Sequence, residues 1–231
     1  MRKLTLTALL LIAPMLAPLA RADDVSVDIH LGSYPRLVAV PGYPVYYDPY
    51  IRANYFFYDG LYWVYSGDNW YESHWYNGPW HYARPEYVPY YVLRVPVRYY
   101  RRPPPYFAGW RREAPPRWDE HWGREWQEHH EDWNRWDRHA EPPLAPLPTY
   151  QRHYSGSHYP TAENDQHALR QQNYHYEPRD EATRSRWQQQ DERTDDRGQA
   201  HGNPHADGEA HGNPHGDDPH GNPHGEQWTH Q

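Results

Sequence analysis

Residues 54–82 repeat a short unit three times: an aromatic residue, a small polar residue, a glycine and further aromatic residues. The three copies read YDGLYW, YSGDNWY and YNGPWHY. Glycine tolerates the positive φ that tight turns between antiparallel strands require. Asp59-Gly60, between the runs YFFY and LYWVY, is a strong hairpin signal, and residues 66–69 read as a four-residue loop before a further strand. The pattern predicts an antiparallel meander of three or four strands.

Alternation along this stretch assigns side chains to the two faces of the sheet. Tyr62 and Val64 point one way, while Leu61, Trp63 and Tyr65 point the other way. Aromatic side chains therefore cover both faces, and each cross-strand aromatic pair contributes about 0.2–1 kcal/mol. We take residues 54–107 as the aromatic meander core.

The last part of that core, residues 90–100, also alternates. It reads YYVLRVPVRYY, with apolar and aromatic residues at every second position. The alternation predicts a strand, which Pro96 restricts to a sheet edge or a bulge because proline cannot donate to the ladder.

The first 22 residues have the three parts of a secretory signal peptide. Arg2 and Lys3 precede an apolar run, which ends at the cleavage motif Ala20-Arg21-Ala22. Prolines interrupt the apolar run and make it a poor membrane-spanning helix. We expect cleavage after Ala22, export to the periplasm or beyond, and no transmembrane span in the mature chain.

The charge and cysteine content of the chain exclude some classes of partner. The formal net charge is −8 and Lys3 is the only lysine. An acidic balance and export both argue against nucleic acid as a partner. The chain has no cysteine, so it has no disulfide and no thiol for lipid attachment.

Two segments flank the meander core. Residues 23–53 combine an alternating strand over 23–31 with a proline- and tyrosine-rich connector that cannot form a helix. Residues 108–140 contain an amphipathic helix, whose tryptophans lie on one face at Trp118, Trp122, Trp126, Trp133 and Trp136. We expect this face to pack on the sheet, and docking to a sugar, a lipid surface or a partner groove is the alternative.

The remainder of the chain is poor in aliphatic residues. After Ala140 the only Leu, Ile, Val, Phe or Met residues are Leu144, Leu147 and Leu169. So little apolar area cannot offset the entropy of ordering about ninety residues. We therefore expect a disordered Gln- and Arg-rich linker over 141–200, in which a brief helix can form around Ala162 to Gln172, and a low-complexity tail over 201–231. The predicted fold is mainly β: a small antiparallel aromatic-rich meander with one Trp-rich helix packed on it and a long disordered tail.

The tail carries candidate metal ligands. A His-Gly-Asn-Pro-His unit recurs three times and supplies His201, His205, His211, His215, His220 and His224. Imidazole is the usual ligand for zinc, copper or nickel, so weak binding of these ions is one interpretation. A neutral spacer that arose by repeat expansion is the other, and we expect no tightly bound cofactor.

A second group of candidates could bind a ligand through aromatic and arginine side chains. Flat rings on the meander suit sugar faces, and arginine suits phosphate or carboxylate groups. This group comprises Trp63, Trp70, Trp75, Trp80, Arg94, Arg98 and Tyr100. The alternatives are that the rings fill the core and that the arginines pair with the acidic flank of the tryptophan helix.

Motifs for catalysis are absent from the sequence. It has no nucleophile elbow, zinc-protease helix, phosphate loop or dinucleotide fingerprint. Glu125 and Glu128 could place paired carboxylates for acid–base work, but solvated charge pairing is the ordinary explanation of such spacing. We expect a protein that is not an enzyme.

Three strings together resemble a known class of protein. They are NYFFYDGLYWVYSGDNWYESHWYNGPW, VPYYVLRVPVRYYRRPPPYFAGW and APPRWDEHWGREW, within residues 46–136. The chain resembles small exported bacterial proteins akin to the aromatic-glycine YXWGXW/WXXGXW repeat proteins. The resemblance implies export and a shared folded core, and it implies no activity or ligand.

These observations favour an exported envelope protein that contacts a cell-envelope polymer or envelope protein through its aromatic and Arg/Tyr-rich surface. Divalent-metal buffering by the tail is the alternative function. Edge strands rich in aromatic residues also make self-association plausible.

Overall fold

The computed structural model describes residues 29–133, 135 and 141–200, with side chains up to residue 193. Its strands are β1 (Val38–Ala39), β2 (Tyr46–Tyr47), β3 (Asn54–Tyr58), β4 (Leu61–Ser66), β5 (Asn69–Ser73) and β6 (His81–Ala83). Its α-helices are α1 (Tyr90–Leu93), α2 (Trp118–His129), α3 (Glu163–Asn173) and α4 (Glu181–Ala200). Its 3-10 helices are η1 (Pro85–Tyr87), η2 (Val97–Tyr99), η3 (Pro105–Phe107), η4 (Thr149–His153) and η5 (Gly156–His158). The predicted signal peptide, most of the strand predicted over 23–31, and the tail lie outside the described residues.

The six strands form one antiparallel meander in sequence order. Tyr58 pairs with Leu61, so Asp59 and Gly60 alone form the turn, with φ of 50° and 93°. This confirms the predicted hairpin. The predicted four-residue loop over 66–69 is wrong, because Ser66 pairs with Asn69 and the turn is the two-residue Gly67-Asp68. Aspartate accepts the left-handed conformation that this tighter turn needs.

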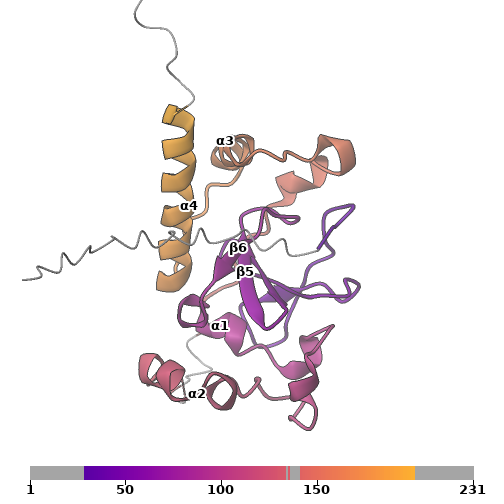
Figure 1. The fold of residues 1–231 in the computed structure, drawn as a ribbon. Coiled ribbons are helices and arrows are strands. Elements are labelled where there is room, and N and C mark those ends of the chain that lie inside the picture. Colours follow the sequence, from indigo (N-terminus) through magenta and orange to yellow (C-terminus); the bar gives the residue numbers. More distant parts are fainter. Residues whose placement is uncertain (1–28, 134, 136–140, 201–231) are drawn as a thin grey trace, which may run out of the picture.

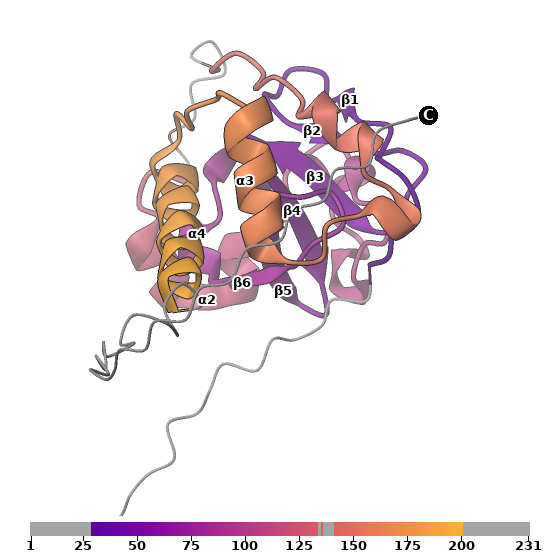
Figure 2. The same cartoon turned by 90° about the horizontal axis from the view of Figure 1, so that it is seen from above.

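The alternation predicted aromatic side chains on both faces of the sheet, and in the structure both faces are buried. One face presents Phe56, Trp63 and Trp70 to a first core cluster, and the other presents Phe57 and Tyr62 to a second cluster. The first face is covered by residues 88–133 and by Trp187, and the second by residues 29–51 and 145–176. In Figure 1, α3 lies above the sheet, α2 lies below it and α4 stands beside the strands. Figure 2 shows α3 crossing over the sheet when it is seen from above.

Residues 90–100 do not form the predicted strand. They form α1 and η2, which begin after Pro89 and Pro96 respectively, and Val92 and Leu93 are buried. The two prolines fix extended φ/ψ at their own positions and interrupt strand pairing. The apolar residues of this segment are therefore buried in compact helical turns that pack on the sheet. They do not pair with the sheet as an additional strand.

The tryptophan helix is shorter than predicted but packs as expected. Helix α2 ends at His129, and Gly123 inside it has non-helical dihedrals, with φ of 74°. Trp118 and Trp126 are buried, and the ring centre of Trp118 lies 6.1 Å from that of Trp70 on the sheet. The predicted packing of this helix on the sheet is confirmed. Trp136 lies outside the described residues.

The expectation of a disordered linker over 141–200 is wrong for the described structure. Helices α3 and α4 occupy this region, and Gln151, Arg170 and Trp187 are buried against the rest of the molecule. Aromatic rings and hydrogen-bonded polar side chains replace the missing aliphatic residues. Tyr62 Oη, for example, lies 3.1 Å from Gln151 Oε1 in the interior. The prediction counted aliphatic area and missed this source of stability.

The mainly β class therefore holds only for the core of the fold. Among the described residues, 36% are helical and 14% lie in strands. The antiparallel aromatic meander is confirmed, but helices enclose it.

Candidate functional site

Segment 97–114 carries five exposed arginines, and we call it the arginine loop. The chain runs out from the core and returns alongside itself. The backbone N–H of Val97 donates to Ala114 O at 3.0 Å, and that of Arg98 donates to Arg112 O at 2.9 Å. These two bonds bring the two ends of the loop together and place residues 98 and 112 side by side.

A buried asparagine fixes the loop to the sheet. Asn54, 3% exposed at the start of β3, donates from Nδ2 to Arg102 O at 2.8 Å and to Tyr65 O at 3.1 Å. The backbone N–H of Arg102 donates back to Asn54 Oδ1 at 2.9 Å. This reciprocal pairing sets the position of residue 102 in the absence of a regular strand.

Buried aromatic side chains anchor the loop in the hydrophobic core. Tyr100 and Phe107 are buried, and their ring centres lie 5.2 Å apart in an edge-to-face arrangement. Phe107 also contacts Trp118 at 5.6 Å. Because these rings point inward, the arginines between them point to solvent. The exposed arginines of the loop are Arg98, Arg101, Arg102, Arg111 and Arg112.

These five arginines have no carboxylate partner within the described residues. Arg98 donates to Tyr99 Oη at 2.9 Å and stacks 4.9 Å from that ring. Some exposed arginines elsewhere are paired, for example Arg124 with Glu128 at 2.9 Å and Arg135 with Asp132 at 3.2 Å. The loop thus concentrates unpaired guanidinium groups on a protein whose net charge is −8.

A cleft of about 490 Å³ lies at one end of the loop, between Arg52 and Arg102. Asp68 is the acidic residue in its lining, and Asp68 Oδ1 accepts from Tyr65 Oη at 2.5 Å and Tyr106 Oη at 2.7 Å. The hydroxyl oxygens of Tyr65 and Tyr106 also lie in direct contact, and His121 Nε2 lies 2.8 Å from the same carboxylate oxygen. Burial opposes ionisation of Asp68, but these hydrogen bonds outweigh it and lower its pKa.

The predicted ligand-binding tryptophans lie elsewhere. Trp63, Trp70 and Trp75 are fully buried and Trp80 is 9% exposed, so their faces cannot stack on a sugar. The prediction of exposed meander rings is wrong, because segments before and after the meander cover both faces of the sheet. The alternative, that these rings fill the core, is the observed one.

The predicted arginines and tyrosine divide between core and surface. Arg94 is 6% exposed and donates from Nη2 to Trp133 O at 2.7 Å, so it fastens the end of the tryptophan helix. Tyr100 is a core residue, and Arg98 remains on the surface. The sequence prediction missed Arg111, Arg112 and Asn54. The Arg111-Arg112 pair was the available signal, but its convergence with Arg98 depends on the reversal of the loop.

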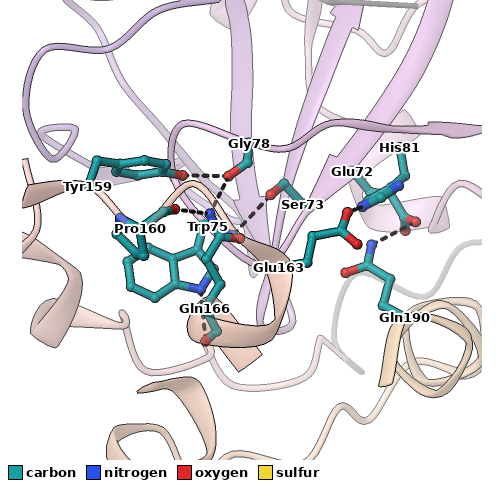
Figure 3. Close-up of polar contacts among 10 residues, drawn as sticks. All are labelled: Glu72, Ser73, Trp75, Gly78, His81, Tyr159, Pro160, Glu163, Gln166 and Gln190. Atoms are coloured by element: carbon teal, nitrogen blue, oxygen red, sulfur yellow. Dashed lines mark hydrogen bonds and ion pairs between the residues drawn. The ribbon is translucent and has the colours of Figure 1, made fainter. Parts of the chain in front are cut away.

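A second polar cluster joins β5 and β6 to α3 and α4 (Figure 3). Trp75 Nε1 donates to Gln166 O at 3.2 Å, and Gln166 Nε2 donates to Gly78 O at 3.1 Å. Glu72 accepts from Gln190 Nε2 at 3.0 Å, and His81 pairs with Glu163 at 3.2 Å. Burial raises the pKa of Glu72 against the opposing charge of Arg186.

The cavity within this cluster is too small to hold a substrate. Its cavity measures about 30 Å³, roughly the volume of one water molecule. His74 lines it with both ring nitrogens buried and without a hydrogen-bond partner among the described residues. Burial, reinforced by the charge of Arg170, holds the pKa of His74 well below its usual value. We interpret the cluster as the attachment of the C-terminal helices to the sheet.

Metal binding has no site in the described part of the chain, where no group of three or more His, Asp or Glu side chains is arranged to hold an ion. The candidate ligands from His201 to His224 lie outside the described residues. Binding of zinc, copper or nickel by the tail stays a prediction.

Comparison with known proteins gave no relative. No family model, no curated protein and no solved structure matches this chain. The resemblance to the YXWGXW repeat proteins therefore stays a prediction. Among the described helices, none is both long and apolar enough to cross a membrane.

Proposed function

We propose that the chain is an exported, non-enzymatic binding module that holds an anionic cell-envelope polymer, or an envelope protein with an acidic surface, on its arginine loop. The observation that carries the proposal is the set of five exposed arginines without carboxylate partners among the described residues, on a protein that is acidic overall. Guanidinium forks match phosphate and carboxylate groups, and they bind them in pairs of parallel hydrogen bonds.

The loop geometry supports recognition of a repeating anion more than recognition of a small molecule. The arginines lie on an open surface, and the lining of the adjoining cleft includes several polar and charged residues. Sites for small ligands are instead enclosed and largely apolar. The Asn54 anchor and the buried rings of Tyr100 and Phe107 hold the backbone in place before any ligand arrives. A pre-ordered surface binds with a smaller entropic cost.

The test is retention of the purified protein on immobilised polyphosphate, polyglutamate and uncharged dextran. We expect retention on the two anionic polymers at low ionic strength and none on dextran. A variant with Arg98, Arg101, Arg102, Arg111 and Arg112 changed to Gln should bind at least about tenfold more weakly, since each exposed charge contact contributes about 0.2–1 kcal/mol.

The matched control changes five exposed arginines elsewhere to Gln: Arg84, Arg117, Arg124, Arg135 and Arg179. It alters the net charge equally and should keep nearly full affinity. Equal loss in both variants would show that binding follows net charge alone and would refute a site on the loop. Preferential displacement by single-stranded DNA would point to nucleic acid instead, against our expectation.

A further inference from the structure

A cleft of about 750 Å³ lies between the first turns of α4 and the segment 86–94, which includes α1. The lower end of α4 lies beside α1 in Figure 1. Small-molecule sites typically measure about 300–1,000 Å³, so the cleft has the size of one. Its described lining contains no residue of the arginine loop, and the cleft is therefore a separate site.

One wall of the cleft is aromatic. Tyr87 is 49% exposed, so much of its ring is open to a ligand, and Tyr90 is half-buried. The ring of Tyr90 is held edge-to-face against Trp133, with ring centres 6.0 Å apart. Neither the Tyr87 nor the Tyr90 hydroxyl hydrogen-bonds to another described residue. This wall thus offers flat ring surfaces with free hydroxyl groups at their edges.

The opposite wall is a polar row on α4. Glu181, Ser185 and Gln189 recur every four residues, which places them about 6 Å apart along one side of the helix. The Glu181 carboxylate and the Ser185 hydroxyl have no side-chain partner in the described part of the chain. Gln189 Oε1 accepts from Arg186 Nη1 at 3.4 Å, which leaves its amide N–H groups to donate. The row therefore presents both acceptors and donors to the cleft.

Hydrogen bonds fix the helical wall to the sheet. Tyr58 Oη, on β3, donates to Asp180 Oδ2 at 3.2 Å. Asp180 Oδ1 in turn accepts from the backbone N–H of Ala182 at 3.0 Å in the first turn of α4. Arg186 Nη2 donates to Tyr82 O on β6 at 3.3 Å. The two walls are thus held apart in a fixed position before a ligand binds, which lowers the entropic cost of binding.

The charges of the cleft favour a neutral ligand. Its described lining holds three acidic and three basic side chains. The tyrosine faces already carry cations, because Arg94 Cζ lies 5.0 Å from the ring centre of Tyr90 and Arg186 Cζ lies 5.6 Å from that of Tyr87. An anion would meet the carboxylate of Glu181, and a further cation would meet these guanidinium groups.

The polar groups narrow the class of neutral ligand. A proline-rich peptide also packs on aromatic rings, but proline has no N–H to donate to the Glu181 carboxylate. A sugar ring has an apolar C–H face for a tyrosine ring, and its hydroxyl groups both donate and accept hydrogen bonds. A sugar therefore matches both walls at once.

We propose that this cleft binds a short neutral oligosaccharide. Its sugar rings pack on Tyr87 and Tyr90, and its hydroxyl groups hydrogen-bond to Glu181, Ser185 and Gln189. The protein then has two independent binding surfaces, the arginine loop for charged polymers and this cleft for uncharged sugars.

The test is calorimetric titration of the intact protein with neutral trisaccharides of glucose, mannose and N-acetylglucosamine. We expect binding of at least one of them. Tyr87→Ala should weaken it at least about fivefold through loss of the ring surface. Glu181→Gln should weaken it about threefold or more, because the charged acceptor is lost. Ser185→Ala, an exposed change on the helix, should also weaken binding and serves as the third variant if Tyr87→Ala does not fold.

The matched controls remove the same groups outside the cleft. Tyr82 is likewise 49% exposed, and Glu192 lies further along α4. Tyr82→Ala and Glu192→Gln should leave the affinity unchanged. The variant with five loop arginines changed to Gln should also keep its sugar affinity, so failure of the proposed function would not imitate failure here.

Three results would overturn the proposal. They are no binding of any of the three trisaccharides by the folded parent protein, equal losses in the cleft and control variants, and tighter binding of an octaproline peptide or a trisaccharide of galacturonic acid than of any neutral sugar.

Discussion

Single polar side chains hold parts of this molecule where regular structure is absent. Asn54 makes three hydrogen bonds from one buried amide, and all three join the arginine loop or the neighbouring strand β4 to β3. Buried amides of this kind are expensive to remove, because their partners stay buried and unpaired.

Replacing Asn54 by Ala should lower the free energy of unfolding by about 2–4 kcal/mol, since two carbonyls and one N–H lose their partner. Urea denaturation measures the loss. The control is Asn69→Ala, whose amide makes one exposed bond to Gly67 O, and it should cost less than about 1 kcal/mol. Equal losses would mean that Asn54 does not anchor the loop.

The buried side chain of His74 makes the free energy of unfolding depend on pH, and the shift of its pKa fixes the direction of that dependence. Its pKa is depressed in the folded protein by burial and by Arg170, whereas the unfolded chain binds the proton near pH 6.5. The stabilising contribution is therefore complete above pH 6.5 and is lost as the pH falls below it. Each pH unit below pH 6.5 lowers the free energy of unfolding by about 1.4 kcal/mol for each proton taken up on unfolding.

We expect the unfolding free energy of the parent protein to fall by about 2 kcal/mol between pH 6.5 and pH 5 because of this group. In His74→Gln that part of the slope should disappear, while in exposed His153→Gln it should remain. Glu72 titrates identically in all three proteins and cancels from the comparison. A parallel pH profile for parent and His74→Gln would contradict the assignment.

At the scale of elements, the first hairpin turn was predictable, whereas the exact second turn and the segments that cover the sheet were not. Asp59-Gly60 specifies a two-residue turn because both positions adopt positive φ. By contrast, β1 and β2 contain two residues each and carry no periodic signal. A brief helix was anticipated around Ala162 to Gln172, where α3 lies, but α4 and the packing of this region were missed. Trp187, Gln151 and Arg170 stabilise the region through ring contacts and buried hydrogen bonds, which a count of aliphatic residues does not register.

Helix α4 packs directly on the first hairpin turn, and substitution of Gly60 in that turn tests the contact. A Cβ on Gly60 would lie 2.5 Å from Trp187 Cζ3, whereas a Cβ on Gly67 would meet open space. Both glycines have positive φ, so both Ala variants share the backbone penalty of about 1–2 kcal/mol.

Gly60→Ala should therefore cost about 1–3 kcal/mol more than Gly67→Ala in thermal or urea unfolding, because of overpacking against Trp187. In the background of Trp187→Ala the difference should shrink to near zero, which a double-mutant cycle measures. A difference that persists without Trp187 would mean that the helix does not pack on this turn.

At the scale of the whole molecule, enclosure of the sheet decides where function can lie. With both faces buried, the tryptophans of the meander are structural and cannot contact a ligand through their ring faces. The sequence marked Arg94 and Arg98 as candidate ligand-binding residues. The loop reversal then added Arg111 and Arg112 and removed Arg94 to the interior, which no local pattern specifies.

The most direct test of the central claim is a dicarbonyl footprint of every arginine of the intact protein, with and without saturating polyphosphate. We predict protection of Arg98, Arg101, Arg111 and Arg112 by the polymer, and unchanged labelling of Arg84, Arg117 and Arg124. Protection should vanish at high ionic strength, where salt screens exposed charges. Uniform protection of all arginines, or protection confined to sites away from residues 97–114, would contradict a binding surface on the arginine loop.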